Sequence, residues 1–164
     1  THLGHSFPTR RSSDLVRVLD LSRVLAGPHC TALLADLGAD VIKFEVPVHG
    51  DDSRHLGPFR EGESVYFGLI NRGKRSVEID FKSESDRARF YELVADADVV
   101  VENFRPGVTQ RLGIDFDTLK QYNPRLIYAS ISGFGQDGPF SRRPAYDIVA
   151  QALSGLMRDR KSVV

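Results

Sequence analysis

Residues 98–113 read DVVVENFRPGVTQRLG, and the interpretation of the whole chain starts from them. The valines at 99–101 form a short apolar run, which is typical of a strand buried on both faces of a parallel sheet. A polar turn follows, and its proline suits the first turn of a helix that we expect to run toward Arg111. Ligands bind just past the carboxyl ends of strands in open α/β sheets. The turn is therefore a predicted ligand site, and Arg105 beside a helix N-terminus favours a phosphate. The alternative is that Phe104 belongs to the core and both arginines are solvated.

The segments on either side alternate between strand and helix patterns. The expected strands cover 16–21, 41–44, 76–81 and 126–131, and the expected helices cover 29–37, 83–95, 117–122 and 146–157. A strand, a helix and a strand within about thirty residues predict parallel strands joined by a right-handed crossover. In the first helix, Leu33, Leu34 and Leu37 share one face and are expected to pack on the sheet. The pattern predicts an α/β fold with a doubly wound, mostly parallel sheet.

The composition is that of one soluble globular domain. The chain has 164 residues, of which 41% are hydrophobic and 27% are charged, and its net charge is zero. Zero net charge argues against nucleic acid or an anionic membrane as a partner. No apolar run is long enough to span a bilayer. The single cysteine, Cys30, excludes an internal disulfide and favours a reducing compartment, so we expect a cytoplasmic protein.

Both ends of the chain resemble translated sequencing-library adapter. Residues 6–14, SFPTRRSSD, can be encoded as TCT TTC CCT ACA CGA CGC TCT TCC GAT, and residues 159–164, DRKSVV, as GAT CGG AAG AGC GTC GTG. The second string is the reverse complement of the end of the first, in an overlapping frame. We therefore expect residues 1–15 and 158–164 to be adapter-derived and non-native, rather than natural disordered tails.

A glycine-rich segment at 133–138, GFGQDG, matches the G-x-G-x-x-G pattern of dinucleotide-binding folds and follows a predicted strand. That function also requires a helix to open at once, and Pro139 and Pro144 interrupt the sequence where the helix would lie. A plain glycine-rich loop is the preferred interpretation over NAD binding.

Several other side chains are candidates for chemistry. Cations near strand and helix ends would suit a ligand with several phosphates, or form a solvated rim: Lys74, Arg75, Lys82, Arg105 and Arg111. The spacing of His29, His49 and His55 does not indicate a metal site. Asp147 could be a nucleophilic carboxylate, but stabilising the helix N-terminus is the preferred role.

Four blocks of sequence together resemble the family III CoA-transferases, of the CaiB/BaiF or formyl-CoA transferase-like type. These blocks are residues 18–45, 71–82, 98–113 and 126–157. The resemblance covers essentially all of 16–157 and identifies it as the N-terminal part of the family's Rossmann-like domain, truncated at the C-terminal side. It implies CoA transfer from an acyl-CoA to a carboxylic acid, and an interlocked homodimer at full length.

The resemblance also implies a set of CoA-contacting residues. By position these are Arg23, Leu25, Ala26, Ile79, Lys82, Asn103, Phe104, Arg111 and Tyr146. Lys82 and Arg111 are cations suited to the nucleotide phosphates, and Phe104 offers an aromatic surface to the adenine or the pantetheine arm. Leu25 and Val46 depart from members that carry polar or basic residues there.

The resemblance places the family's nucleophilic aspartate beyond the helix that starts at Tyr146. No catalytic residue is therefore assigned in this chain, and the fragment is expected to be inactive. In the related α-methylacyl-CoA racemases a histidine, which titrates near neutral pH, stands where this chain has Tyr146. A transferase is therefore favoured over a racemase or a CoA-dependent lyase of the same fold. A non-catalytic domain that binds CoA or a nucleotide is the alternative from another class.

Overall fold

The computed structural model describes residues 15–157. The ends predicted to be adapter-derived lie outside this range, except Leu15. Five parallel strands form the main sheet, in the order β5-β2-β1-β6-β7. Their bounds are β1 Arg17–Asp20, β2 Asp40–Glu45, β5 Arg75–Glu78, β6 Val99–Glu102 and β7 Ile127–Ser130. This order confirms the predicted α/β class: the first strand lies in the centre, and the chain builds outward from it in both directions.

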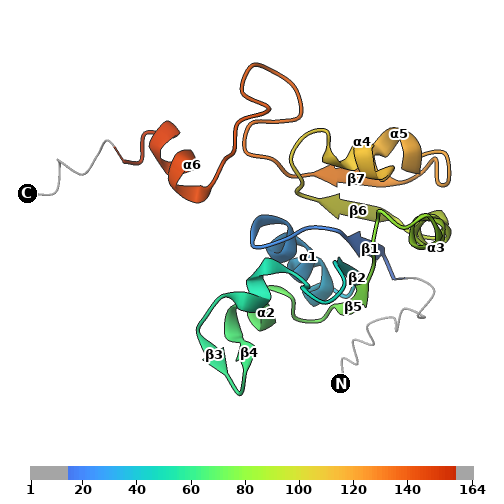
Figure 1. The fold of residues 1–164 in the computed structure, drawn as a ribbon, viewed down its shortest axis with the longest axis horizontal. Coiled ribbons are helices and arrows are strands. Elements are labelled where there is room, and N and C mark those ends of the chain that lie inside the picture. The colour runs from blue at the N-terminus through green and yellow to red at the C-terminus, as the bar shows by residue number, and fades with distance from the viewer. Residues whose placement is uncertain (1–14, 158–164) are drawn as a thin grey trace, which may run out of the picture.

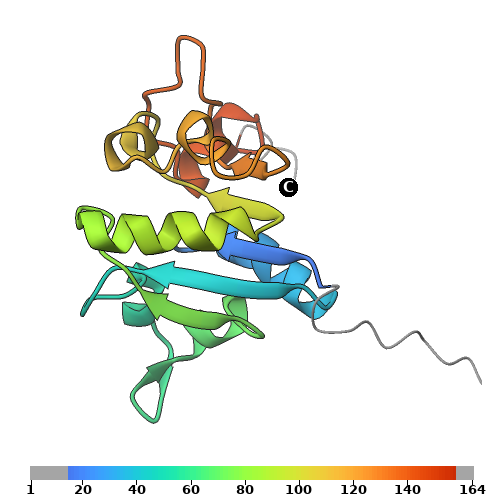
Figure 2. The same cartoon turned by 90° about the vertical axis from the view of Figure 1, so that its right-hand side faces the viewer.

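Helices cover both faces of the sheet (Figures 1 and 2). The helices are α1 Ala26–Asp36, α2 Val65–Ile70, α3 Glu84–Ala95, α4 Val108–Leu112, α5 Phe116–Leu119 and α6 Asp147–Leu153. A 3-10 turn, η2 Asp52–His55, and a small antiparallel hairpin, β3 Phe59–Arg60 with β4 Glu63–Ser64, complete the described elements. Within the described residues no helix is both long and apolar enough to cross a membrane.

The alternation of side chains along the strands divides the core in two. Leu19 pairs in register with Ile42 and Val100, and all three pack on the side of Phe90 from α3. The neighbouring residues along the strands point the other way, where Val18, Val41 and Val101 pack with Leu34 and Ala35 of α1. The three central strands β1, β2 and β6 therefore bury apolar side chains on both faces, as the valine run at 99–101 predicted.

The expected inner face of α1 was wrong in two of its three leucines. Leu33 is 47% exposed and Leu37 is 85% exposed, while Leu34 packs toward the sheet. The buried face instead consists of small residues, Gly27, Pro28, Thr31 and Ala32. Small side chains bring the helix axis close to the strands, and Leu33 and Leu37 lie on the outer side.

The helix after the valine strand begins later than expected. Gly107 has a left-handed backbone, with φ of 85°, and caps α4, so Pro106 lies in the turn before the helix. A left-handed residue cannot continue a right-handed helix, which explains the shift. The helix has only five residues, and its N-terminus lies after Gly107 rather than at Pro106.

The last helix does not pack on the sheet. The helix α6 has no buried residue, and its apolar side chains Ile148 and Leu153 are 65% and 67% exposed. Figure 1 shows it standing apart from the sheet at the end of a long connection after β7. The strand β7 is an outer strand, and Ile127 on it is 62% exposed, so the fully buried strand predicted at 126–131 is also corrected.

Candidate functional site

A pocket of about 210 Å³ lies at the carboxyl ends of β1, β2, β5 and β6. Its lining consists of Leu21, Arg23, Phe44, Glu45, Val46, Ile79, Asp80, Phe81, Lys82, Phe104 and Leu112. The floor is apolar, and the cations Arg23 and Lys82 lie among its polar lining. This is the edge of an open parallel sheet at which ligands are expected. Four of the nine predicted CoA residues meet here: Arg23, Ile79, Lys82 and Phe104.

Two neighbouring turns form one side of the pocket. Arg23 follows β1 and Phe104 follows β6, and these adjacent strands continue into helices on opposite faces of the sheet. The guanidinium of Arg23 lies over the ring of Phe104, 5.4 Å from its centroid. Asn103 joins the turns: its Oδ1 accepts a hydrogen bond from Arg23 N at 2.8 Å, and its Nδ2 donates to Arg23 O at 2.8 Å.

The opposite side of the pocket follows β5. Ile79 is buried, and its backbone N–H donates to Glu45 O of β2, which extends the sheet contact past the end of the strand. Lys82 is exposed, and its backbone N–H donates to Asp80 Oδ1 at 2.9 Å in a tight turn. The side chain of Lys82 can therefore reach a ligand anion at the mouth of the pocket.

The remaining predicted CoA residues do not line this pocket. Leu25 and Ala26 are exposed at the start of α1, and Asn103 lies behind Arg23. Arg111 is exposed on α4, next to Leu112 of the lining. Tyr146 is 70% exposed, directly before α6.

Two of the cations expected to meet a phosphate are engaged elsewhere. The ammonium group of Lys74 is buried and contacts Asp20 Oδ2 at 2.9 Å, as well as Asn71 Oδ1 and Pro28 O. Burial lowers the pKa of Lys74, although Asp20 partly opposes this shift. Arg75 pairs with Asp40 at the amino end of β2. Neither side chain is free for the phosphate role considered for it.

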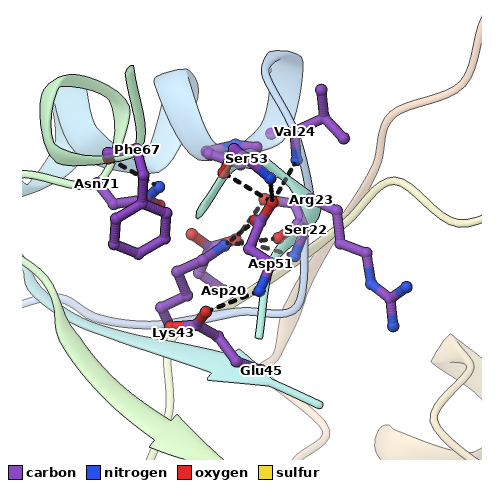
Figure 3. A network of polar contacts seen from close by, with 12 residues as sticks. Asp20, Ser22, Arg23, Val24, Lys43, Glu45, Asp51, Ser53, Phe67 and Asn71 are labelled. Carbon is purple, nitrogen blue, oxygen red and sulfur yellow. Dashed lines mark hydrogen bonds and ion pairs between the residues drawn. The ribbon is translucent and has the colours of Figure 1, made fainter. Parts of the chain in front are cut away.

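A buried polar network, which was not predicted from the sequence, lies beside the pocket (Figure 3). The ammonium of Lys43 and the carboxylate of Asp51 form an ion pair at 2.7 Å, with both side chains 1% exposed. Burial alone would raise the pKa of Asp51, but Lys43 and the hydrogen bonds from Ser53 lower it below its usual value. A signal was present in the sequence: Lys43 is two positions after Val41, so it shares the buried face of β2.

Glu102 ends β6 with a buried carboxylate. Its Oε2 accepts a hydrogen bond from Phe104 N at 2.7 Å, and its Oε1 contacts the hydroxyl of Ser130 on β7. Burial raises the pKa of Glu102, and these two hydrogen bonds only partly offset that shift. The contact fixes the turn that carries Phe104.

The glycine-rich segment at 133–138 opens no helix, which confirms the prediction of a loop. A Cβ on Gly133 would lie 1.8 Å from Ala145 Cβ, so the loop folds back against the residues that precede α6. Within residues 15–157 no group of three or more His, Cys, Asp or Glu side chains is arranged to hold a metal ion. Asp147 accepts a hydrogen bond from Gln151 within α6.

A family model described as CoA-transferase family III matches residues 14–160. An acetyl-CoA:oxalate CoA-transferase of Acetobacter aceti is 55% identical, over 88% of this chain and 37% of its own length. A succinyl-CoA:mesaconate CoA-transferase of Haloarcula hispanica is 50% identical, over 88% of this chain and 38% of its own length.

A solved structure shows the same architecture. The CAIB/BAIF family protein from Brucella suis superposes with a TM-score of 0.83 at 48% identity, covering 89% of this chain and 40% of the other. The chain thus spans less than half the length of these relatives.

Proposed function

Because this chain belongs to CoA-transferase family III, we propose that the protein moves CoA from an acyl-CoA donor to a carboxylic acid, and that the pocket beside Arg23 binds CoA. The chain covers little more than a third of the curated relatives, so the activity is proposed for a protein of their length.

The observation that carries this proposal is the convergence of Arg23, Lys82 and Phe104 around one pocket. These residues are far apart in the sequence and come from the ends of different strands. Two cations suit the phosphates of CoA, and an aromatic ring beside an apolar floor suits its adenine or its pantetheine arm. Arg111 and the predicted contacts at Leu25 and Ala26 would extend this binding surface beyond the pocket.

The proposed chemistry passes through an aspartyl-CoA thioester. An aspartate attacks the acyl-CoA carbonyl, which releases CoA thiolate and leaves a mixed anhydride. The thiolate attacks the aspartyl carbonyl, forming the enzyme thioester and freeing the donor acid. The acceptor carboxylate repeats these two steps in reverse and leaves as the new acyl-CoA. We assign the nucleophile to a residue outside this chain rather than to Asp147.

A racemase of the same fold is the second candidate, and Tyr146 argues against it. Racemisation requires proton transfer at the carbon beside the thioester, for which histidine is suited near neutral pH. A non-catalytic CoA-binding domain is the remaining alternative, and only a transfer assay separates it from a transferase. The proposal also includes an interlocked homodimer and a cytoplasmic location, for which the exposed Cys30 thiol favours a reducing environment.

Direct binding of CoA to the 164-residue chain tests the pocket. Lys82→Ala removes a cation from the proposed phosphate contact and should weaken CoA binding about tenfold, measured by isothermal titration calorimetry. Lys120→Ala is the matched control, because Lys120 is an exposed cation paired with Asp117 on α5 and does not line the pocket. Equal losses in both variants would show a general charge effect and exclude this pocket as the CoA site.

A transfer assay tests the reaction. A chain of the relatives' length that contains residues 16–157 should exchange CoA between acetyl-CoA or succinyl-CoA and oxalate or mesaconate, the acids in the names of the two relatives above. The 164-residue chain alone should bind CoA without turnover. Turnover by it that disappears in Asp147→Ala would refute our assignment of the nucleophile.

A further inference from the structure

The segment Ser22–Val24, which carries Arg23 into the pocket, has an unusual backbone. Val24 has φ of 66°, a left-handed conformation that is unfavourable for a β-branched residue. A residue persists in this conformation only when the surrounding contacts hold it there. Figure 3 shows the side chain of Arg23 pointing away from the buried network on which its backbone rests.

Hydrogen bonds fix this segment from two sides. On one side, the amide of Asn103 bonds both the N–H and the C=O of Arg23, each at 2.8 Å. On the other side, the ammonium of Lys43 donates to Ser22 O at 2.9 Å, and Asp51 Oδ1 accepts from Val24 N at 3.2 Å. Each of the three residues in the segment therefore has a backbone group held by a distant side chain.

The Lys43–Asp51 pair is itself rigid. Both side chains are 1% exposed, and Ser53 donates two further hydrogen bonds to Asp51 Oδ1, at 2.7 and 2.9 Å. Asp51 N donates to Glu45 Oε2, which anchors the pair to the end of β2. A buried ion pair contributes little net stability compared with apolar residues of the same size, so a role in positioning explains its presence better.

We propose that Asn103 and the Lys43–Asp51 pair are positioning residues, which hold the guanidinium of Arg23 in place to receive a phosphate group of CoA. This inference rests on the proposed function. An arginine loses side-chain freedom when it binds an anion, and a backbone fixed beforehand reduces the ordering that binding requires. The inference also gives Asn103 a role behind the pocket in place of the direct contact expected from the sequence.

A mutant cycle tests the positioning role. Lys43→Met with Asp51→Leu removes both charges together, and this avoids leaving one charge buried and unpaired. We expect this double variant and Arg23→Ala each to weaken CoA binding by about tenfold, and the triple variant to be no weaker than Arg23→Ala by more than about twofold. Binding of pantetheine, which has no phosphate, should change in none of them. Losses that multiply in the triple variant would overturn the proposal.

A second measurement needs no ligand. Hydrogen exchange should speed up at the amide of Val24 in the double variant, and at the amide of Arg23 in Asn103→Ala, which alters a half-buried side chain and keeps the ion pair. Unchanged exchange would overturn the positioning role of Asn103 and the Lys43–Asp51 pair, even if the pocket does bind CoA. Exchange that changes as expected in a chain that fails to bind CoA would instead refute the proposed function.

The control removes an ion pair at the other end of the same strand. Arg75→Met with Asp40→Leu eliminates the pair at the amino end of β2 and should leave CoA affinity and Val24 exchange unchanged. A loss of CoA affinity in this control equal to that of the Lys43 and Asp51 variant would show that any damaged ion pair on β2 weakens binding, and would overturn the proposal.

Discussion

Glu45, the last residue of β2, has a buried carboxylate with hydrogen bonds to both oxygens. Arg54 donates to Oε1 and to Oε2, each at 2.7 Å, and Asp51 N donates to Oε2 at 2.9 Å. Burial raises the pKa of Glu45, but the bonds from Arg54, Ser76 and Asp51 outweigh it and lower the pKa from 4.5 to about 2. The folded protein therefore stabilises the ionised carboxylate of Glu45 more than the unfolded chain does.

This lowered pKa predicts a specific loss of stability in acid. Above pH 4.5 the contribution of Glu45 is fully present, and it disappears as the pH falls toward about 2, a change of about 3 kcal/mol in the free energy of unfolding. Glu45→Gln should be less stable at pH 7 and should lose less stability between pH 5 and pH 2, measured by urea unfolding. Parallel pH profiles of the two proteins would contradict this prediction.

At the scale of elements, the approach of α1 to the end of β1 depends on Gly27. A Cβ on Gly27 would lie 2.1 Å from Ser22 Cβ and 2.3 Å from Ser22 Oγ, and Ser22 is fully buried. Gly27→Ala should therefore push the helix from the strand and destabilise the protein by about 1–3 kcal/mol in urea unfolding.

A second glycine provides the matched control. Gly68 lies exposed in α2, and a Cβ added to it would meet no atom within 4 Å. Gly68→Ala should stabilise the protein by about 0.5–1 kcal/mol, because alanine has less freedom to lose on folding. If Gly27→Ala stabilised the protein as Gly68→Ala does, the result would show that α1 can shift away from Ser22 without a loss of stability.

The strands were easier to predict from the sequence than the faces of the helices. The valine run at 99–101 and the alternating run at 16–21 required only local patterns, and both are strands. The positions of Leu33 and Leu37 were predicted wrongly because α1 has one face with leucines and another with small residues. Only packing in three dimensions shows that the face with small residues is the one against the sheet.

The candidate site was predictable to the same degree. Lys82 and Phe104 were indicated by their places near strand ends and by the family resemblance, and Arg23 by the resemblance alone; all three line one pocket. The buried ion pair was missed because Asp51 belongs to a long polar segment, and no local pattern indicates which strand such a segment contacts.

For the whole molecule, the open side of the sheet at β7 governs behaviour at high concentration. The strand β7 pairs with β6 alone, and Ile127 is 62% exposed on it. Unpaired outer strands with apolar residues promote association between chains, and lysine at such positions opposes it. Ile127→Lys should slow the growth of aggregates of the 164-residue chain, measured by dynamic light scattering.

The matched control for this prediction is Val48→Lys. Val48 is 99% exposed but lies in a turn after β2, at the other side of the sheet from β7. It adds the same charge and removes an exposed apolar side chain, so it should have the smaller effect. Equal effects of the two substitutions would mean that added charge, and not the outer strand, controls association.

The central place of β1 has a consequence for the order in which the protein can fold. The ribosome makes β1 before the other strands of the sheet, but Val100 of β6, the partner of Leu19, is synthesised about eighty residues later. Until β6 is made, β1 can pair only with β2, and the side of β1 that faces β6 in the folded sheet has no partner. Parallel sheets with such distant pairings fold slowly, so the nascent chain carries β1 with one side unpaired while these residues are made, and it is a natural client for chaperones.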